Sequence, residues 1–229
     1  MPYRSSHLEH RQRMLEAYDA NEAKIVQGWT NARTEQDQLA LLEDLLEYCP
    51  FTPGMKVLDV GAGTGILSLA LAKIDGLNLT ALEPCPALVE HLRKNLLFND
   101  IQITQGFCDH ESDRRHFEEV SFDRIVSRQV VNTLFDPCEA FTNWNRWLRP
   151  DGIVVVMDAL LRREDWPGRW APFVDALPLS ACDSMATVPY LLERCGFEVL
   201  SVSLMNRCNE IANSPTKRFM IVARKINGS

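Results

Sequence analysis

The feature that most limits how this chain can fold is a short apolar segment that runs into a glycine-rich turn and then into a helical pattern. The apolar segment is 57–60, the glycines are Gly61, Gly63 and Gly65, and the helical pattern is 66–72. Glycine adopts backbone conformations that other residues avoid and lets a ligand come close to the main chain. A strand, a tight turn and the start of a helix, in this order, are typical of a nucleotide-type cofactor site.

Strand-like and helix-like segments alternate through most of the chain. We expect strands at 56–60, 77–82, 101–105, 122–127 and 152–157, and helices at 65–74, 86–97, 137–148 and 188–195. Alternation of this kind places helices on both faces of a parallel sheet. After residue 196, two strand-like segments at 197–205 and 218–223 follow each other with a polar loop and no helix between them. Strands joined in this way pair antiparallel.

The predicted fold class is therefore α/β, a doubly wound, seven-stranded sheet that is mostly parallel with one antiparallel strand at the C-terminal end. Residues 51–229 form this domain, and 1–50 form N-terminal helices that act as a lid or cap. A capping box at 34–37 begins the firmest of these helices. Residues 6–26 are polar with thinly spaced apolar positions, which predicts helices loosely attached to the body.

Composition argues against several classes of partner. The formal net charge of −7 disfavours a general nucleic-acid surface. The seven cysteines are scattered without a CxxC pair, which favours reduced thiols over a disulfide framework or a zinc site. No stretch of about 18 apolar residues predicts a membrane span, and the first residues lack the apolar core of a signal peptide. We expect a soluble cytoplasmic protein without a metal, nucleic acid or membrane partner, either a monomer or a homodimer.

Two acidic residues accompany the glycine turn. Asp59 stands two residues before Gly61, and Glu83 follows Gly65 by eighteen residues at the end of the second strand. A carboxylate at the end of the neighbouring strand accepts hydrogen bonds from ribose hydroxyls, so we expect an adenosine-containing ligand. An acid beside the turn would repel a pyrophosphate but attract an ammonium group. S-Adenosylmethionine carries an ammonium and a sulfonium and no phosphate, and it is therefore favoured over a nicotinamide dinucleotide.

Several ordered motifs resemble one family of enzymes. They are VLDVGAGTG at 57–65, Glu83, FDRIVSRQVVNTLFDP at 122–137, LRPDG at 148–152 and the terminal antiparallel pair. The set is similar to class I S-adenosylmethionine-dependent methyltransferases over nearly the whole chain. The segment after the fourth strand is more narrowly similar to a bacterial subgroup, of the methyltransferase type 11 kind, usually associated with small molecules. The resemblance implies a Rossmann-like fold, with S-adenosylmethionine as methyl donor and S-adenosylhomocysteine as product.

The resemblance also implies a set of cofactor contacts. They are Asp59, Gly61, Ala62, Gly63, Gly65, Glu83, Pro84, Leu88, Phe107, Cys108, Asp109 and Ser127. Within this set Glu83 would bind the ribose, and Pro84 and Leu88 would border the adenine. The family often has Gly-Asp-Ala after the third strand, whereas this chain has Gly-Phe-Cys-Asp at 106–109. The acid is therefore displaced by two positions or replaced by an aromatic wall.

Methyl transfer from a sulfonium is an in-line displacement in which alignment of the reactants supplies much of the acceleration. We therefore expect no catalytic triad. The resemblance places Ser127 and Arg128, at the end of the fourth strand, at the sulfonium and the transferred methyl. Asp158 at the tip of the fifth strand and His110 beside Asp109 are candidates to hold or deprotonate an acceptor.

Aromatic and polar residues near the carboxyl edge of the sheet are candidate acceptor contacts. They are Tyr18, Trp29, Arg128, Asn132 and Trp166. Trp166 belongs to an insertion at about 160–183, which forms either a substrate-side lid or surface helices packed on the sheet. The predicted function is methyl transfer to N, O or C of a small molecule. A peptide or protein acceptor and a non-catalytic cofactor-binding module are the alternatives.

Overall fold

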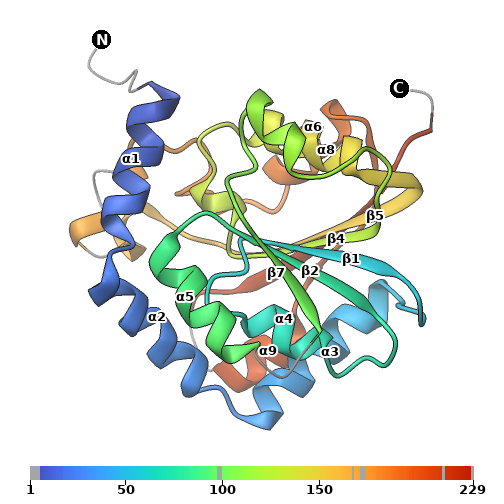
Figure 1. Ribbon diagram of the computed structural model, residues 1–229, viewed down its shortest axis with the longest axis horizontal. Coiled ribbons are helices and arrows are strands. Elements are labelled where there is room, and N and C mark those ends of the chain that lie inside the picture. The colour runs from blue at the N-terminus through green and yellow to red at the C-terminus, as the bar shows by residue number, and fades with distance from the viewer. Residues whose placement is uncertain (1–5, 97–99, 167, 171–173, 213–214, 228–229) are drawn as a thin grey trace.

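The computed structural model describes residues 6–96, 100–166, 168–170, 174–212 and 215–227, which form a seven-stranded sheet flanked by helices (Figure 1). The strands are β1 (Lys56–Val60), β2 (Asn78–Glu83), β3 (Ile101–Gln105), β4 (Phe122–Arg128), β5 (Leu148–Ala159), β6 (Phe197–Leu204) and β7 (Arg218–Lys225). Their order is β3-β2-β1-β4-β5-β7-β6. Strands β1 to β5 pair in parallel, and β7 runs antiparallel to both neighbours. The predicted sheet, with one antiparallel strand at the C-terminal end, is confirmed.

Helices cover both faces of the sheet. One face carries α6 (Pro137–Trp147) and α8 (Thr187–Arg194), and the other carries α3 (Glu35–Tyr48), α4 (Ile66–Leu71) and α9 (Asn206–Ala212) (Figure 1). Successive strand residues point to opposite faces. Accordingly, Val154 packs in the core beneath α6, whereas Val155 packs in the core beneath α3 and α4. Because both faces are covered, the centre of β5 is apolar without alternation.

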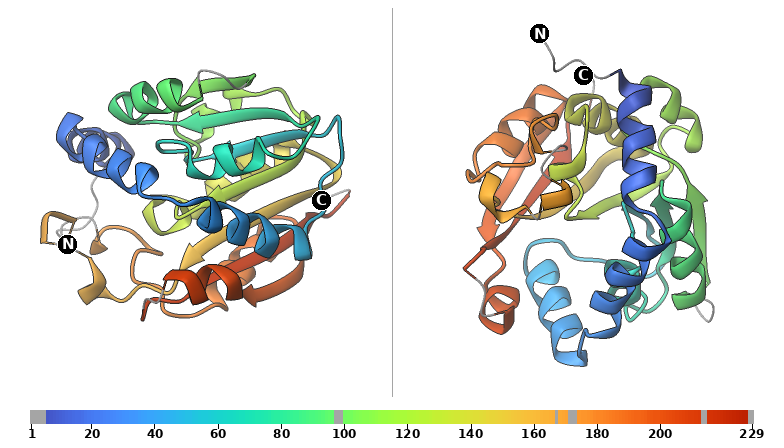
Figure 2. Two further views of the ribbon diagram at one scale, coloured as in Figure 1. Left: turned by 90° about the horizontal axis from the view of Figure 1, so that it is seen from below. Right: turned by 90° about the vertical axis from the view of Figure 1, so that its left-hand side faces the viewer.

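Two further helices precede α3 and lie along one side of the molecule. They are α1 (His7–Ala17) and α2 (Ala20–Asn31), and α2 lies beside α5 (Pro86–Asn95) (Figures 1 and 2). The capping box that starts α3 is present as predicted. Helix α1 is attached more firmly than its pattern indicates, because Arg11 forms ion pairs with Asp109 and Asp113. This attachment depends on charged contacts, which the spacing of apolar residues in the sequence cannot predict.

One secondary-structure prediction was wrong. The segment between β6 and β7 was expected to be a polar loop, but it contains α9. The N-terminus of α9 is capped from α3, because the Asp44 carboxylate accepts hydrogen bonds from the backbone N–H groups of Arg207 (3.2 Å) and Cys208 (2.9 Å). Asp44 is more than 160 residues away in the chain, so no local signal announces this helix start.

Strand β5 also begins earlier than predicted, at Leu148 instead of residue 152. The turn residues 149–152 lie within an irregularity of the β4–β5 pairing, where Phe122 pairs with Leu148 and Arg124 pairs with Ile153. Short 3-10 helices complete the described elements, namely η1 (Glu111–His116), η2 (Val131–Thr133), η3 (Arg163–Asp165) and η4 (Gly168–Trp170). Within the described part of the chain, no helix has the length and apolar character needed to cross a membrane.

Candidate functional site

The three glycines of the turn serve different structural needs. All have positive φ, at 67°, 58° and 99° for Gly61, Gly63 and Gly65. A Cβ atom on Gly61 would lie 2.4 Å from Val130 Cγ2, and one on Gly65 would lie 2.9 Å from Leu92 Cδ1. A Cβ atom on Gly63, by contrast, would have no described atom within 4 Å. Gly61 and Gly65 therefore allow close packing, and Gly63 leaves open space on the cavity side.

Glu83 ties the end of β2 to this turn. The side chain is buried, and its two oxygens accept hydrogen bonds from the backbone N–H groups of Gly63 and Cys85, each at 2.9 Å. Burial raises the pKa of Glu83, and the two hydrogen bonds act in the opposite direction. Each oxygen keeps a lone pair, so the carboxylate is positioned to accept hydrogen bonds from two adjacent hydroxyl groups.

Asp59 is the second acid beside the turn. It is buried, and Ser68 Oγ donates a hydrogen bond of 2.5 Å to its Oδ2. Burial raises the pKa of Asp59 to about 7, while the nearby Arg128 charge lowers it. A cationic group placed beside Asp59 would favour the ionised carboxylate, and the pair would be stabilised by the low dielectric of the site.

A large cavity connects these residues. It encloses about 1300 Å³ of space free of atoms, part of it open to solvent. Its described lining includes ten predicted cofactor residues, namely Asp59, Gly61, Ala62, Gly63, Glu83, Pro84, Leu88, Phe107, Cys108 and Asp109. Arg128 and the predicted acceptor residues Tyr18 and Trp29 also line it. We call this space the donor cavity.

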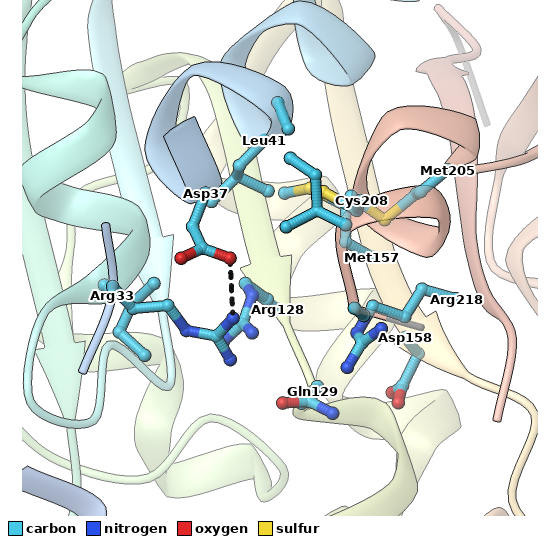
Figure 3. A pocket seen from close by; sticks show the side chains of 14 residues that line it. Arg33, Asp37, Leu41, Arg128, Gln129, Met157, Asp158, Met205, Cys208 and Arg218 are labelled. Carbon is cyan, nitrogen blue, oxygen red and sulfur yellow. Dashed lines mark ion pairs between the residues drawn. The ribbon is translucent and has the colours of Figure 1, made fainter. Parts of the chain in front are cut away.

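A smaller cavity adjoins the donor cavity (Figure 3), with about 510 Å³ of space free of atoms when the part open to solvent is counted. Both are lined by Arg33, Ile66, Arg128 and Gln129. Asp158 lies in the smaller cavity, where Asn132 Nδ2 and the backbone N–H of Ala159 donate hydrogen bonds to its carboxylate at 2.9 and 2.8 Å. Burial raises the pKa of Asp158 to about 7, against the effect of these hydrogen bonds.

Several predicted site residues lie outside the described lining of both cavities. Gly65 packs against α5, and Ser127 is fully buried with no hydrogen-bond partner for its Oγ among the described residues. His110 is the N-cap residue of η1, where its Nδ1 lies 2.9 Å from Ser112 Oγ. Asn132 supports Asp158, and Trp166 Nε1 donates to the backbone oxygen of Ser180. Contacts of these residues with ligands stay predictions.

Sequence reasoning also missed residues that line the cavities. Helix α1 contributes His10 and Met14 to the donor cavity, and Arg218 lines the smaller one. A signal for Arg218 was available, because the first residue of an antiparallel strand lies at the edge where the parallel strands end. In the structure Arg218 pairs with Ala159, the last residue of β5.

Asp109 contacts both α1 and the segment that follows β4. It accepts a hydrogen bond from the backbone N–H of Phe135 at 3.0 Å, forms an ion pair with Arg11 of α1, and lies 3.4 Å from His7 Nε2. Burial opposes its ionisation, but His7, the Phe135 N–H and Arg11 together hold the pKa of Asp109 below its usual range. Asp109 therefore anchors α1 over the donor cavity, in addition to its place in the lining. No group of three side chains suited to hold a metal ion occurs among the described residues.

Comparisons with known proteins identify the family. A family model described as a methyltransferase domain matches residues 32–202. A ubiquinone biosynthesis O-methyltransferase of Xanthomonas campestris is 30% identical over 138 residues, which is 58% of this chain and 57% of that protein. A ribosomal protein L11 methyltransferase of Thermosipho africanus is 32% identical over 106 residues, which is 45% of this chain and 37% of that protein. The matches thus span about half or less of these relatives.

A solved structure supports the fold. An S-adenosylmethionine-dependent methyltransferase from Aquifex aeolicus superposes with a TM-score of 0.66 at 17% identity, covering 91% of this chain and 99% of that one. At 17% identity this similarity shows the fold alone. The family model, in contrast, spans well over half of the 229 residues. The chain therefore belongs to the class I S-adenosylmethionine-dependent methyltransferase family.

Proposed function

We propose that the protein transfers a methyl group from S-adenosylmethionine to an N, O or C atom of a small molecule. The observation that carries this proposal is the pair of adjoining cavities, which share Arg128 at their junction. The larger one has the acids and the glycine turn suited to the donor. The smaller one brings charged and apolar side chains together beside it, including Arg128, Asp158 and Met157.

The residues of the donor cavity fit S-adenosylmethionine. Glu83 has lone pairs available for the ribose hydroxyls, and the open side of Gly63 leaves room for the ligand at the main chain. We assign Asp59 to the ammonium of the methionine portion, and Pro84 and Leu88 to the adenine; all three residues line the donor cavity. When bound, the cofactor supplies a sulfonium-activated methyl group as the electrophile.

The remaining task of the protein is to align the acceptor, exclude water and receive a proton where the acceptor loses one. We assign the proton to Asp158, whose carboxyl group lines the smaller cavity and has a pKa of about 7 because of burial. Such a pKa suits a general base near neutral pH. Arg128 is assigned to orient the acceptor from the junction of the cavities.

Residues 1–50 are assigned the role of a lid over the donor cavity. Helices α1 and α2 contribute His10, Met14, Tyr18 and Trp29 to its lining. Thr30 Oγ1 on α2 lies 2.5 Å from Thr64 Oγ1 of the glycine turn. The insertion at about 160–183 joins this cover, because Trp170 lies 4.9 Å from Tyr18 between ring centroids. Residues 167 and 171–173 of this insertion lie outside the described residues.

A protein or peptide acceptor is the second candidate. The Thermosipho relative is named for methylation of a ribosomal protein, and it supports this reading. The Xanthomonas relative is named for methylation in ubiquinone biosynthesis, and it supports a small molecule. A cofactor-binding module without catalysis is the third candidate, since binding and turnover use the same glycine turn.

Calorimetric titration with S-adenosylmethionine and S-adenosylhomocysteine tests the donor assignment. We expect saturable binding, and we expect Glu83→Gln to weaken it at least tenfold. Glu90→Gln is the matched control, because Glu90 lies on the exposed face of α5 and pairs only with Lys94 among the described residues. Absence of binding at millimolar cofactor, or equal affinity of the Glu83 variant, would refute the assignment.

Incubation with methyl-labelled cofactor separates the acceptor classes. A cell extract is divided into its protein fraction and its protein-free filtrate. Label transferred by the wild-type protein to the filtrate supports a small molecule, and label confined to protein supports the second candidate. Cofactor binding without transfer to either fraction would support the module.

A further inference from the structure

Three arginine side chains converge on the smaller cavity from distant parts of the chain. Arg33 follows α2, Arg128 ends β4 and Arg218 begins β7. Their guanidinium groups point toward the middle of the cavity (Figure 3). The parallel pairing of β4 with β5 and the antiparallel pairing of β7 with β5 bring the last two to one edge of the sheet.

These guanidinium groups are only partly compensated by protein acids. Arg33 forms an ion pair with Asp37 at 3.5 Å, but its buried Nε has no hydrogen-bond partner among the described residues. The buried Nη1 of Arg218 also lacks a partner there. The Arg128 side chain, in contrast to its backbone in β4, makes no hydrogen bond or ion pair with any residue that the structure describes. Donor groups are therefore available in the cavity.

The other charged groups near the cluster do not balance it. Asp37 is shared with Thr34, which donates hydrogen bonds to it from its backbone N–H and Oγ1. Asp158 and Asp59 are buried carboxyl groups with pKa values of about 7, so each is only partly ionised at neutral pH. Burial and the charges of Arg33 and Arg218 lower the pKa of Arg128 to about 10. An excess of positive charge remains inside a chain whose net charge is −7.

Apart from these charged groups and Gln129, the cavity wall is largely apolar. It is formed by Ala40 and Leu41 of α3, Ile66 of α4, Met157 of β5, and Met205 and Ile211 around α9. An occupant that fits both parts has a charged head and an apolar body. Guanidinium groups match carboxylate and phosphate oxygens with paired hydrogen bonds, so the head is an anion.

We propose that the smaller cavity binds the methyl acceptor through an anionic carboxylate or phosphate group, held by Arg128 and Arg218 with Arg33 beside them. The proposal rests on the proposed function for the statement that the occupant is the methyl acceptor. The acceptor class is then a small organic acid or phosphate ester with an apolar body against Leu41, Met157 and Met205.

The carboxylate of the donor itself is the competing partner of this cluster. Arg33 and Arg128 line both cavities, so either anion is within their reach. Arg218, in contrast, belongs to the described lining of the smaller cavity alone. Substitution of Arg218 therefore distinguishes the acceptor anion from the donor carboxylate.

The test is calorimetric titration of the full chain, saturated with S-adenosylhomocysteine, with phenyl phosphate, benzoate and benzyl alcohol. The three probes share a ring and differ in the head group, so the first two also distinguish phosphate from carboxylate. We expect at least one anionic probe to bind tenfold or more tightly than benzyl alcohol. We expect Arg218→Met to weaken that anionic probe tenfold or more while the affinity for S-adenosylhomocysteine changes less than twofold.

Arg224→Met is the matched control, because Arg224 lies on the same strand and pairs with Glu198 at the surface. It should bind the probes as the wild type does, and Arg218→Gln should repeat the effect of Arg218→Met if the latter folds poorly. Equal binding of neutral and anionic probes, or no anionic binding at 10 millimolar, would overturn the proposal. Equal loss of S-adenosylhomocysteine binding in the Arg218 variants would assign the cluster to the donor.

Failure of the proposed function has a different signature. If the wild-type protein bound no S-adenosylhomocysteine but bound an anionic probe in an Arg218-dependent way, the anion site would stand and the methyltransferase assignment would fall. If the cofactor bound and the anionic probes did not, the cofactor assignment would be supported and the anion site would be refuted.

Discussion

Replacement of Arg128 by methionine is expected to stabilise the folded protein while abolishing its activity. Arg128 is a charged side chain held in a cavity beside two other arginines, without an ion pair to any described residue. An uncompensated charge of this kind opposes folding, because the unfolded chain hydrates it fully. Methionine keeps an unbranched chain of similar reach and removes the charge.

The magnitude follows from the pKa. Burial and the charges of Arg33 and Arg218 lower the pKa of Arg128 to about 10, and a lowering of this size corresponds to about 3 kcal/mol of free energy lost by the charged form. Arg128 stays protonated at neutral pH, so removal of its charge makes folding of the variant more favourable. Lost packing and the loss of a cation near Asp59 and Asp158 reduce the gain to about 1–2 kcal/mol. For a chain of this length, that gain raises Tm by about 2–8 °C.

The assay is urea unfolding without ligand, followed by circular dichroism, with Arg224→Met as control. The exposed pair of Arg224 with Glu198 contributes at most about 1 kcal/mol, so the control should lie at or slightly below wild type. An increased midpoint for Arg128→Met at unchanged m-value supports the reasoning. Destabilisation by more than about 1 kcal/mol would refute it, since Arg128 would then have a structural role that the cavity does not account for.

Three further predictions concern the glycine turn, the proposed base and the anchor of α1. Gly61→Ala should unfold the protein, because its Cβ would overlap Val130 Cγ2. Gly63→Ala should lower the free energy of unfolding in denaturant by about 1–2 kcal/mol through backbone strain. It should also remove the cofactor binding that calorimetry measures. Asp158→Asn should lower kcat/KM about 100-fold and remove the limb near pH 7 from the pH–rate profile. Because folding raises the pKa of Asp158 from 3.8 to about 7, wild type loses stability as the pH rises from about 4 to about 7. The free energy of unfolding of Asp158→Asn should therefore rise relative to wild type over that range, and a constant difference between the two proteins would contradict this. Arg11→Met should lower stability by about 1–3 kcal/mol at pH 7 and weaken S-adenosylhomocysteine binding, with exposed Arg13→Met as control. Burial opposes ionisation of Asp113, but His116 and Arg11 lower its pKa to about 2, so the difference should vanish as the pH falls through about 4 to 2, and a pH-independent difference would count against the ion pairs.

The parts of the fold predicted from sequence are those encoded by local pattern. The strand β1 was predicted at its observed bounds because an apolar run ends at a glycine with obligatory positive φ. The central residues of β5 were predicted because a strand covered on both faces is apolar throughout. Helix α9 was missed because its cap is a carboxylate on α3, and the firm seat of α1 was missed because it depends on acids a hundred residues away.

The candidate site divides in the same way. Asp59 and Glu83 were found because their spacing from the glycine turn fixes their place relative to it. His110 and Trp166 were chosen by residue type and position in the chain, but each makes local contacts outside the described cavity lining. Side-chain direction in loops depends on tertiary contacts, and sequence spacing does not determine it.

The two cavities share Arg33 and Arg128 but differ in their other charged residues, and this difference concerns how a donor and an acceptor would meet. The donor cavity presents Asp59 and Glu83, which suit a ligand with an ammonium and hydroxyl groups. The smaller cavity presents Arg128 and Arg218, which suit an anion. A sulfonium bound near Arg128 would add a second positive charge at the junction, and in a low-dielectric site this repulsion is costly. An acceptor with an anionic group would offset that charge, so the arginines proposed to bind the acceptor would also make the approach of donor and acceptor electrostatically favourable.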